Sequence, residues 1–483
     1  MSRVILINNQ TAGNNKKKIF QYKVETRHAT DQNFQLCEKE FRNNFAVGVE
    51  LGAQLTIYHK GKVVVDLAGK ILEKPYKPEK KTNEIGDKCI NNENRELMAT
   101  IIEYSHQSLQ TVYSSTKNLT AMCVAKCVEK GHFLYNDKVC KHWPEFGNNG
   151  KENITIADVL RHDAGLFRFH RQGKPEDVMD QKKMFKLIED SPLNYFKSVH
   201  TPRPEPFIAP PADGKRRGYH GVSRGCILGC LIQKVDGREL QQFFKEEIVN
   251  LLPEKLNGNV YISQTEEEQK KHHFADMAPY QSRWCQTDPD IGLYLGGGKM
   301  AKFAKENQRD GSIFLMNSVS FGFPNSVMSR ALTIGSASGT CNAFGLGTLA
   351  AVMAGKGTLN GVQILSEETY DLAHSAITQK YDDVLLEEER FAQGGFAEFR
   401  LTHLSRETSE GRGSLIGGAN NFGLKGSFYG WGGSGGSAFC WSPEYEIGFA
   451  YTMNGMASFT LGGPRTTRIF NGLFESLKQM GYE

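Results

Sequence analysis

The sequence predicts an α+β fold in which one antiparallel sheet, flanked by helices, is assembled from both chain ends around an inserted helical lobe. Residues 53–69 (AQLTIYHKGKVVVDLAG) alternate apolar and polar positions on either side of Gly61, which is typical of a β-hairpin. Residues 436–454 (GSAFCWSPEYEIGFAYTMN) contain two more strand-like runs around a Ser-Pro turn. Between about 112 and 250, apolar residues recur at helical spacing, as in NLTAMCVAKCVEKG and GCILGCLIQKVDG.

Further elements complete this plan along the chain. A helix is expected at about 31–44, and the last helix carries an apolar stripe of Ile469, Phe470, Leu473, Phe474 and Leu477. The stretch 72–110 is charged and contains prolines, so we expect an exposed loop. The stretch 264–330 has no clear period and is expected to lie over the surface or the site. The predicted divisions are 1–44 as N-terminal extension and first helix, 45–111 as the first part of an α/β lobe, 112–345 as the helical lobe, and 346–483 as the second part of the α/β lobe with the C-terminal helix.

Overall charge argues for a small partner. The 483 residues include 58 Lys and Arg against 54 Asp and Glu, a net charge of +4. Nothing in this balance points to nucleic acid or to an anionic membrane, so we expect a small-molecule partner and no nucleic acid. No apolar run reaches the roughly 18 residues of a membrane span, and the first residues lack the apolar region of a signal peptide. We expect a cytoplasmic protein, with a mitochondrial one as the alternative because the start is basic.

Cysteine and histidine spacing indicates no metal and no cofactor. Ten cysteines are too dilute in this chain for a disulfide scaffold, so free thiols are expected. Cys123 and Cys127, like Cys226 and Cys230, are four residues apart in apolar helical stretches, where buried packing is favoured over ligation. The sequence contains no H-E-x-x-H pattern.

Two serines match the G-x-S-x-G pattern of a hydrolase nucleophile, and both lack its context. That pattern requires a buried strand, a sharp turn and then a helix. Ser434, in Gly432-Gly433-Ser434-Gly435-Gly436, is followed by strand-like GSAFCW. Ser223 does enter a helix, but it follows the basic polar stretch PADGKRRGYH. With 50 glycines in the chain, such matches arise readily by chance.

The better candidate nucleophile is Ser114. In VYSSTKNLTAMC it precedes Lys117 by three residues at the start of an apolar helix, and this is the only S-x-x-K in the chain. Residues at this spacing share a helix face, so the lysine amine can lie beside the serine hydroxyl. Burial and the positive helix N-terminus disfavour the charged lysine, which must lose its proton to act as a base. From these four residues alone, the alternative to a nucleophile and its base is that Ser114 caps the helix N-terminus and Lys117 is solvated.

Four stretches in order make this sequence resemble the serine β-lactamase-like hydrolases, the superfamily of class C β-lactamases, penicillin-binding proteins and the esterases that share their fold. The likeness runs from the hairpin near residue 46 to the last helix. SSTK (114–117) corresponds to the family's S-x-x-K, and ITIADVLRHDAGL (154–166) resembles its L-x-H-x-S-G-L segment. YHGVSRGCILGCLIQKVDG (219–237) resembles the tyrosine motif and its helix. WGGSGG (431–436) takes the place of K-T-G or H-x-G, with GFAYTMNG (448–455) as the neighbouring strand.

The resemblance implies a β-lactamase/transpeptidase-like fold and a role for each matching residue. Ser114 is then the nucleophile, Lys117 its base or proton relay, and Tyr219 the phenol that shuttles a proton to or from the leaving group. A lysine ammonium nearby would stabilise the tyrosine anion. His162 is expected to be structural.

The WGGSGG stretch takes the place of the family's third motif and is expected to supply the oxyanion and substrate side of the site. Ser434 falls where the family's strand gives its second oxyanion N–H, so its backbone is expected to act, beside Trp431, Gly432 and Gly433. Two positions depart from the family. Gly221 stands where a polar side chain commonly follows the tyrosine motif, and Trp431 stands in the place of a cation or imidazole. Some esterases of this superfamily have W-G-G at this position.

We therefore expect a serine hydrolase that forms an acyl-enzyme, most of all on small neutral esters, with weak or no β-lactamase activity. Trp431 would offer substrate an apolar face and one indole N–H. A cation for a substrate carboxylate could still come from Arg216, Arg217 or Arg224. The alternative is a pseudoenzyme of this fold that serves an assembly, and an oligomer or larger assembly is left open.

Overall fold

The computed structural model describes residues 21–72, 104–170, 175–193, 214–253, 259–279, 325–385, 387–401, 423–456 and 464–483. Most of the expected loop at 72–110 and of the irregular stretch at 264–330 lies outside these residues, as does the N-terminal extension before residue 21.

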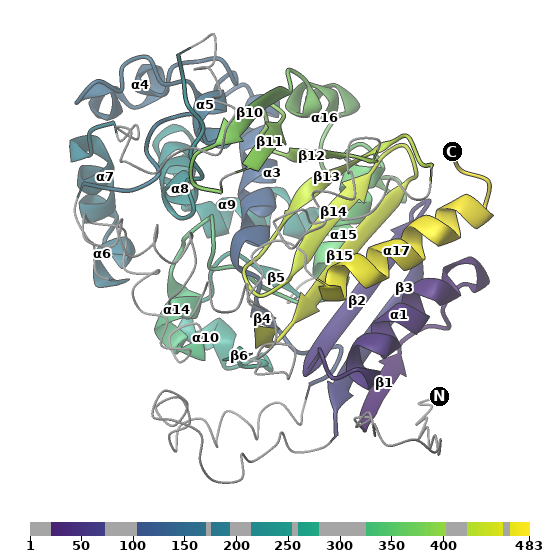
Figure 1. Cartoon of the computed structure of the whole chain (residues 1–483). Coiled ribbons are helices and arrows are strands. Elements are labelled where there is room, and N and C mark those ends of the chain that lie inside the picture. The colour runs from purple at the N-terminus through teal and green to yellow at the C-terminus, as the bar shows by residue number, and fades with distance from the viewer. Residues whose placement is uncertain are drawn as a thin grey trace, which may run out of the picture.

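A nine-stranded sheet forms the centre of the α/β lobe (Figure 1). Its strand order is β1-β3-β2-β15-β14-β13-β12-β11-β10, and every neighbouring pair is antiparallel. The strands are β1 (Tyr22–Thr26), β2 (Gly52–His59), β3 (Lys62–Ile71), β10 (Thr378–Asp382), β11 (Glu387–Phe391), β12 (Ala397–Arg400), β13 (Ser427–Gly432), β14 (Ala438–Ser442) and β15 (Ile447–Met453). The short strands are β4 (Gln110–Thr111), β5 (Val260–Tyr261), β6 (Ala278–Pro279), β7 (Thr340–Cys341), β8 (Thr358–Leu359), β9 (Val362–Gln363) and β16 (Gly455–Met456).

The two ends of the chain meet where β2 pairs with β15. Phe449 lies opposite Ile57 in this pair, and Leu55 lies opposite Leu67 in the β2–β3 hairpin. The expected hairpin and the sheet built from both chain ends are therefore confirmed.

Helices cover both faces of the sheet and build the second lobe (Figure 1). They are α1 (Gln35–Ala46), α3 (Thr116–Glu129), α4 (Val139–His142), α5 (Ile156–Leu160), α6 (Pro175–Met179), α7 (Gln181–Asp190), α8 (Ser223–Asp236), α9 (Leu240–Glu247), α10 (Glu266–Gln269), α14 (Val327–Ala331), α15 (Ala343–Ala354), α16 (Glu367–His374) and α17 (Pro464–Gln479). The helices α1 and α17 pack together on one face of the sheet, and α15 packs on β2, β14 and β15.

Strand β15 shows why its sequence fits between these layers. Its large side chains alternate toward the α17 face, where the Phe449 ring stacks on Phe470 with 4.3 Å between centroids. Its small residues face α15, because a Cβ on Gly448 would lie 2.5 Å from the backbone nitrogen of Ala351. The five stripe residues of α17 named above are all fully buried, as the sequence predicted.

The helical lobe is organised around α3. This helix contacts α8, α9 and α16, and every residue from Thr116 to Ala125 is buried. Cys123, Cys127, Cys226 and Cys230 belong to the lobe's apolar core and are free thiols. Strand β4 pairs with β7 and leads directly into the start of α3.

Four strands of the sheet were not predicted from the sequence: β1, β10, β11 and β12. Their sequences are YKVET, TQKYD, EEERF and AEFR. Strands β1 and β10 form the two edges, and β11 and β12 lie next to the β10 edge. Charged residues suit such positions, so these strands carry little of the apolar alternation by which strands are recognised.

Across the described ranges, no helix combines the length and the apolar character needed to cross a membrane. The compartment and the oligomeric state stay predictions.

Candidate active site

Ser114 and Lys117 lie side by side where the chain enters α3. Ser114 belongs to a 3-10 helix at Tyr113–Ser115 that precedes α3, and Lys117 lies in the first turn of α3. The Nζ of Lys117 is 3.1 Å from the Oγ of Ser114. Tyr113, directly before the serine, has a φ of 45°, and its carbonyl accepts a hydrogen bond from Thr116 Oγ1 at 2.5 Å. Such a left-handed backbone is costly for tyrosine, so surrounding contacts must hold it.

Lys117 is buried among uncharged partners. Its side chain is 1% exposed, and its Nζ lies 2.8 Å from Gly221 O and 3.0 Å from Ser336 O. Burial, and then the nearby Arg224 guanidinium, hold the pKa of Lys117 well below its ordinary value. The two N–H groups of a neutral amine can be donated to the two carbonyls, which leaves the lone pair for the Ser114 hydroxyl proton. This geometry allows a neutral Lys117 amine to accept the Ser114 proton.

Tyr219 reaches Ser114 from the loop before α8. Its hydroxyl donates to Ser114 Oγ at 2.7 Å, and Lys117 Nζ lies 4.7 Å from its ring centroid. Burial raises the pKa of Tyr219 to about 12, against the opposing effect of the bond to Ser114. The phenol is therefore protonated at neutral pH. A protonated phenol beside an amine whose pKa is lowered differs from the tyrosine anion and lysine ammonium that the resemblance implies.

Buried polar groups fix the Tyr219 loop. The Oδ1 of Asp382 accepts hydrogen bonds from the backbone N–H of Tyr219 at 3.0 Å and of Val384 at 2.8 Å. The Nδ1 of His162 accepts from the backbone N–H of His220 at 2.9 Å, and its ring lies 4.9 Å from that of Tyr219. Burial holds the pKa of His162 well below its ordinary value, so the ring stays neutral. His162 thus supports the loop through its bond to the His220 backbone.

Trp431 packs behind the phenol. It lies at the end of β13, and its indole Nε1 is 3.4 Å from the Tyr219 hydroxyl, to which it can donate. Its ring stacks on Tyr219 with 5.8 Å between centroids and lies 5.4 Å from the Phe391 ring. Trp431 is only 2% exposed, so the apolar face that was expected to meet substrate is covered by its neighbours. Its N–H is directed at the tyrosine oxygen.

The glycine-rich turn after β13 lies against the segment that carries Ser114. Ser437 Oγ is 2.9 Å from Val112 O and 3.1 Å from Ser115 Oγ. A Cβ on Gly433 would lie 2.1 Å from Val112 O, so this close approach requires glycine. Ser434 sits within the turn and is partly exposed.

Neither serine of the G-x-S-x-G matches has the setting of a nucleophile. Ser434 is followed by strand β14 and by no helix, as the sequence indicated. Ser223 begins α8, but it is buried and its hydroxyl donates to Leu166 O at 2.5 Å.

The three arginines considered as substrate cations have partners within the protein. Arg216 donates to both carboxylate oxygens of Asp383 at 2.7 Å. Arg217 donates to Asp163 at 2.9 and 3.2 Å. Arg224 is buried and donates to a backbone carbonyl between β11 and β12 at 3.0 Å.

Several supporting groups were not found from the sequence. The carbonyls of Gly221 and Ser336, which hold Lys117, carry no sequence signal because every residue has a carbonyl. Asp382 stands in KYDDVL, where no local pattern separates it from a surface carboxylate. At Gly221 the sequence indicates only a missing polar side chain, whereas its backbone carbonyl accepts a hydrogen bond from Lys117.

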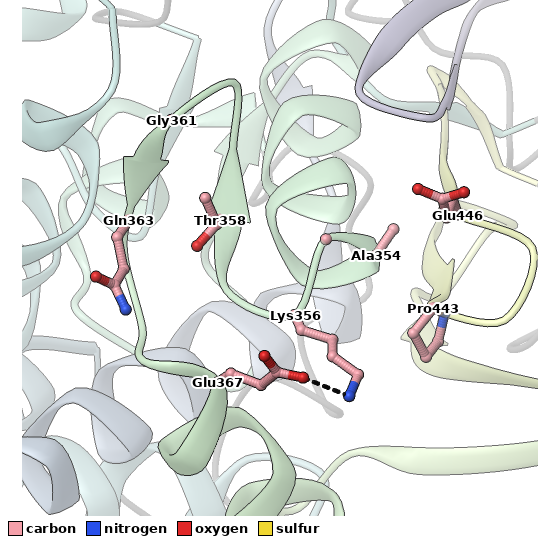
Figure 2. A pocket seen from close by; sticks show the side chains of 9 residues that line it. Ala354, Lys356, Thr358, Gly361, Gln363, Glu367, Pro443 and Glu446 are labelled. Carbon is pink, nitrogen blue, oxygen red and sulfur yellow. Dashed lines mark hydrogen bonds and ion pairs between the residues drawn. The ribbon is translucent and has the colours of Figure 1, made fainter.

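A hollow of 660 Å³ lies elsewhere, at the C-terminal end of α15 beside β8 and β9 (Figure 2). The Nζ of Lys356 is 2.7 Å from Glu367 at its edge, and Glu446 lines another side. It contains none of the expected site residues. In the part of the chain that the structure describes, no group of His, Cys, Asp or Glu is placed to hold a metal ion.

Comparisons with known proteins identify the family and the fold. The beta-lactamase family model matches residues 41–473. The esterase/beta-lactamase LipL of Mycobacterium tuberculosis is 29% identical over 154 residues, and the match spans 31% of this chain and 31% of that protein. The chain thus covers about a third of the length of the curated relatives it matches.

Two solved structures show the same fold. A family VIII carboxylesterase has a TM-score of 0.67 at 23% identity, covering 94% of this chain and 100% of the other. A penicillin-binding protein homologue from Caulobacter crescentus has a TM-score of 0.66 at 24% identity, with coverage of 94% and 100%. With a family match that extends over most of its length, this chain belongs to the beta-lactamase family.

Proposed function

We propose that the chain is a serine hydrolase that forms an acyl-enzyme on Ser114. The observation that carries the proposal is the double contact of the Ser114 hydroxyl, which lies 3.1 Å from Lys117 Nζ and 2.7 Å from the Tyr219 hydroxyl. Burial lowers the pKa of Lys117 and raises the pKa of Tyr219, so a base and an acid flank one nucleophile.

Each group has a distinct part in the proposed acylation. Lys117 takes the proton of the Ser114 hydroxyl as Oγ attacks the ester carbonyl carbon. Tyr219 gives its proton to the departing alkoxide oxygen as the ester C–O bond breaks, and the proton on Lys117 then restores the phenol. A water molecule repeats these steps on the acyl-enzyme, releasing the acid and free Ser114.

The negative charge of the tetrahedral intermediate requires hydrogen-bond donors. The backbone N–H groups of Ser114, at the start of α3, and of Ser434, in the turn after β13, are the proposed donors. Contacts of Ser437 with Val112 and Ser115 keep that turn against the nucleophile segment, which supports this assignment.

Small neutral esters are the proposed substrate class. Trp431 occupies the third-motif position with a neutral N–H that is directed at Tyr219, and Arg216, Arg217 and Arg224 already have partners. Leaving a substrate carboxylate buried and unpaired costs several kcal/mol, which corresponds to about a thousandfold in kcat/KM. A side-by-side measurement should show p-nitrophenyl butyrate hydrolysed much faster than penicillin or a D-Ala-D-Ala peptide. A β-lactam preferred over every neutral ester would contradict this substrate class.

Intact-mass measurement after reaction with a fluorophosphonate tests the proposed nucleophile. We expect one adduct on the wild-type protein, none on Ser114→Ala, and one on Ser434→Ala, the control with the other glycine-flanked serine. Labelling that depends on Ser434 would overturn the assignment. A folded wild-type protein that is not labelled would instead favour the inactive member of the family that serves an assembly.

A further inference from the structure

Side chains at the start of α17 donate hydrogen bonds to the glycine-rich turn after β13. The guanidinium of Arg465 donates to Gly435 O, and it donates to Gly455 O at 2.8 Å. Thr466 Oγ1 donates to Gly436 O at 3.3 Å. Arg465 is 4% exposed and Thr466 is fully buried. Two consecutive carbonyls of the turn are therefore tied to two consecutive residues of one helix.

This turn is intrinsically free to move, so such ties matter. Gly435 has a φ of 88° and Gly436 a φ of 116°, in a region that favours glycine. Inside the turn, the N–H of Gly433 is bonded to Ser437 O at 2.8 Å, and that of Gly436 to Gly433 O at 3.0 Å. These bonds close the turn but do not fix its direction relative to the rest of the sheet.

Arg465 is itself held rigidly. Its guanidinium pairs with the carboxylate of Glu50, with one contact at 3.2 Å, and Glu50 is fully buried. The hydroxyl of Tyr451 donates to the same carboxylate at 2.5 Å. A guanidinium that is paired in this way has a defined plane, and its remaining N–H groups point in fixed directions. The ion pair with Glu50 therefore fixes the direction of the Arg465 N–H that donates to the carbonyl of Gly435.

We infer that Arg465 is a positioning residue for the oxyanion donor. It holds the peptide between Gly435 and Gly436, whose N–H donates to Gly433 O at 3.0 Å, and Gly433 O belongs to the same peptide unit as the Ser434 N–H. The inference rests on the proposed function. Arg465 acts through the turn and does not touch the reacting atoms. Preorganised donors of this kind stabilise the transition state more than the bound substrate, so their loss lowers kcat and leaves KM nearly unchanged.

Kinetics on a pair of variants isolates the contacts with the turn. Removing Arg465 alone would leave Glu50 buried without its countercharge, which by itself destabilises a protein. We therefore compare Glu50→Gln/Arg465→Met with Glu50→Gln as its reference. Arg468→Met is the matched control, because Arg468 lies on the same helix and donates to Asn44 at 3.1 Å. Thermal unfolding is recorded for each protein, and p-nitrophenyl butyrate is the substrate.

The double variant should lose about 10- to 100-fold in kcat relative to its reference, with KM steady. The midpoint of its pH–rate profile should not move, because the contacts of Lys117 are intact. A folded double variant with the kcat of its reference overturns the inference. If that variant does not fold, Thr466→Val tests the second tie to the turn. Its kcat should fall about threefold, and an unchanged kcat would contradict the inference. A wild-type protein inert toward esters and the phosphonate would overturn the proposed function itself, and the positioning role with it.

Discussion

Replacing Lys117 with arginine tests whether this side chain has to be uncharged. A guanidinium can still donate to the carbonyls of Gly221 and Ser336, which now lie 2.8 and 3.0 Å from the amine. It keeps its proton at every working pH and has no acceptor, so it cannot take the proton of Ser114. The substitution therefore keeps donors for the two carbonyls and removes the base.

Two losses are expected from Lys117→Arg. A positioned acid or base contributes about 10² to 10⁴ in rate, equivalent to about 3 to 5 kcal/mol of activation free energy. The lysine is 1% exposed, so the larger head group has no free space. Overpacking of this kind costs about 1 to 3 kcal/mol of unfolding free energy.

The assay is kcat and kcat/KM for p-nitrophenyl butyrate, with thermal unfolding measured in parallel. Lys126→Arg is the control, because Lys126 lies on the same helix and also donates to a carbonyl, that of Ile364 at 2.8 Å. Lys126→Arg should keep wild-type turnover. A folded Lys117→Arg protein with near wild-type turnover would refute lysine as the base.

Three further results are expected. Tyr219→Phe should lower kcat by about 10² to 10⁴ without unfolding, measured by initial rates and circular dichroism, and unchanged turnover would remove the phenol from the mechanism. Because the pKa of Lys117 is lowered, kcat/KM should rise with pH along a limb whose midpoint lies below the ordinary lysine value of about 10.4, and a midpoint at that value contradicts the neutral amine. Burial lowers the pKa of His374 from 6.5 to about 3, so below about pH 6.5 the unfolded state binds a proton that the folded state does not. Stability is then lost as pH falls, by about 2 kcal/mol between pH 7 and pH 5. Urea unfolding at both pH values should show this loss reduced in His374→Gln, and an undiminished loss would contradict the assignment.

The contact between Ser114 and Lys117 could be predicted because the two residues are close in the sequence. Ser114 and Lys117 are three residues apart, and helix geometry alone brings them to one face. Tyr219 could be located only through resemblance to a family, because no local rule connects positions so far apart. The donation of Trp431 to Tyr219 could not be predicted, since it depends on how strand β13 meets the loop before α8.

The apolar parts of the fold were predictable, and the polar parts were not. The hairpin around Gly61 and the stripe of α17 each carry a clear period of buried residues. The strands near the sheet edges are largely charged, so pairing partners and not sequence pattern define them. In the sequence, Arg465 is likewise one more charged residue near a helix start. Only its burial and its bonds to Glu50 and Gly435 distinguish it from a surface arginine.

Peptide mapping of the acyl-enzyme tests the central claim most directly. The wild-type protein is quenched in acid shortly after mixing with p-nitrophenyl acetate, and the tryptic peptides covering residues 96–117 and 426–465 are fragmented. An acetyl group is expected on Ser114, and none on the adjacent Ser115 or on Ser434. An acetyl group carried by Ser115 or Ser434, with Ser114 unmodified, would contradict it.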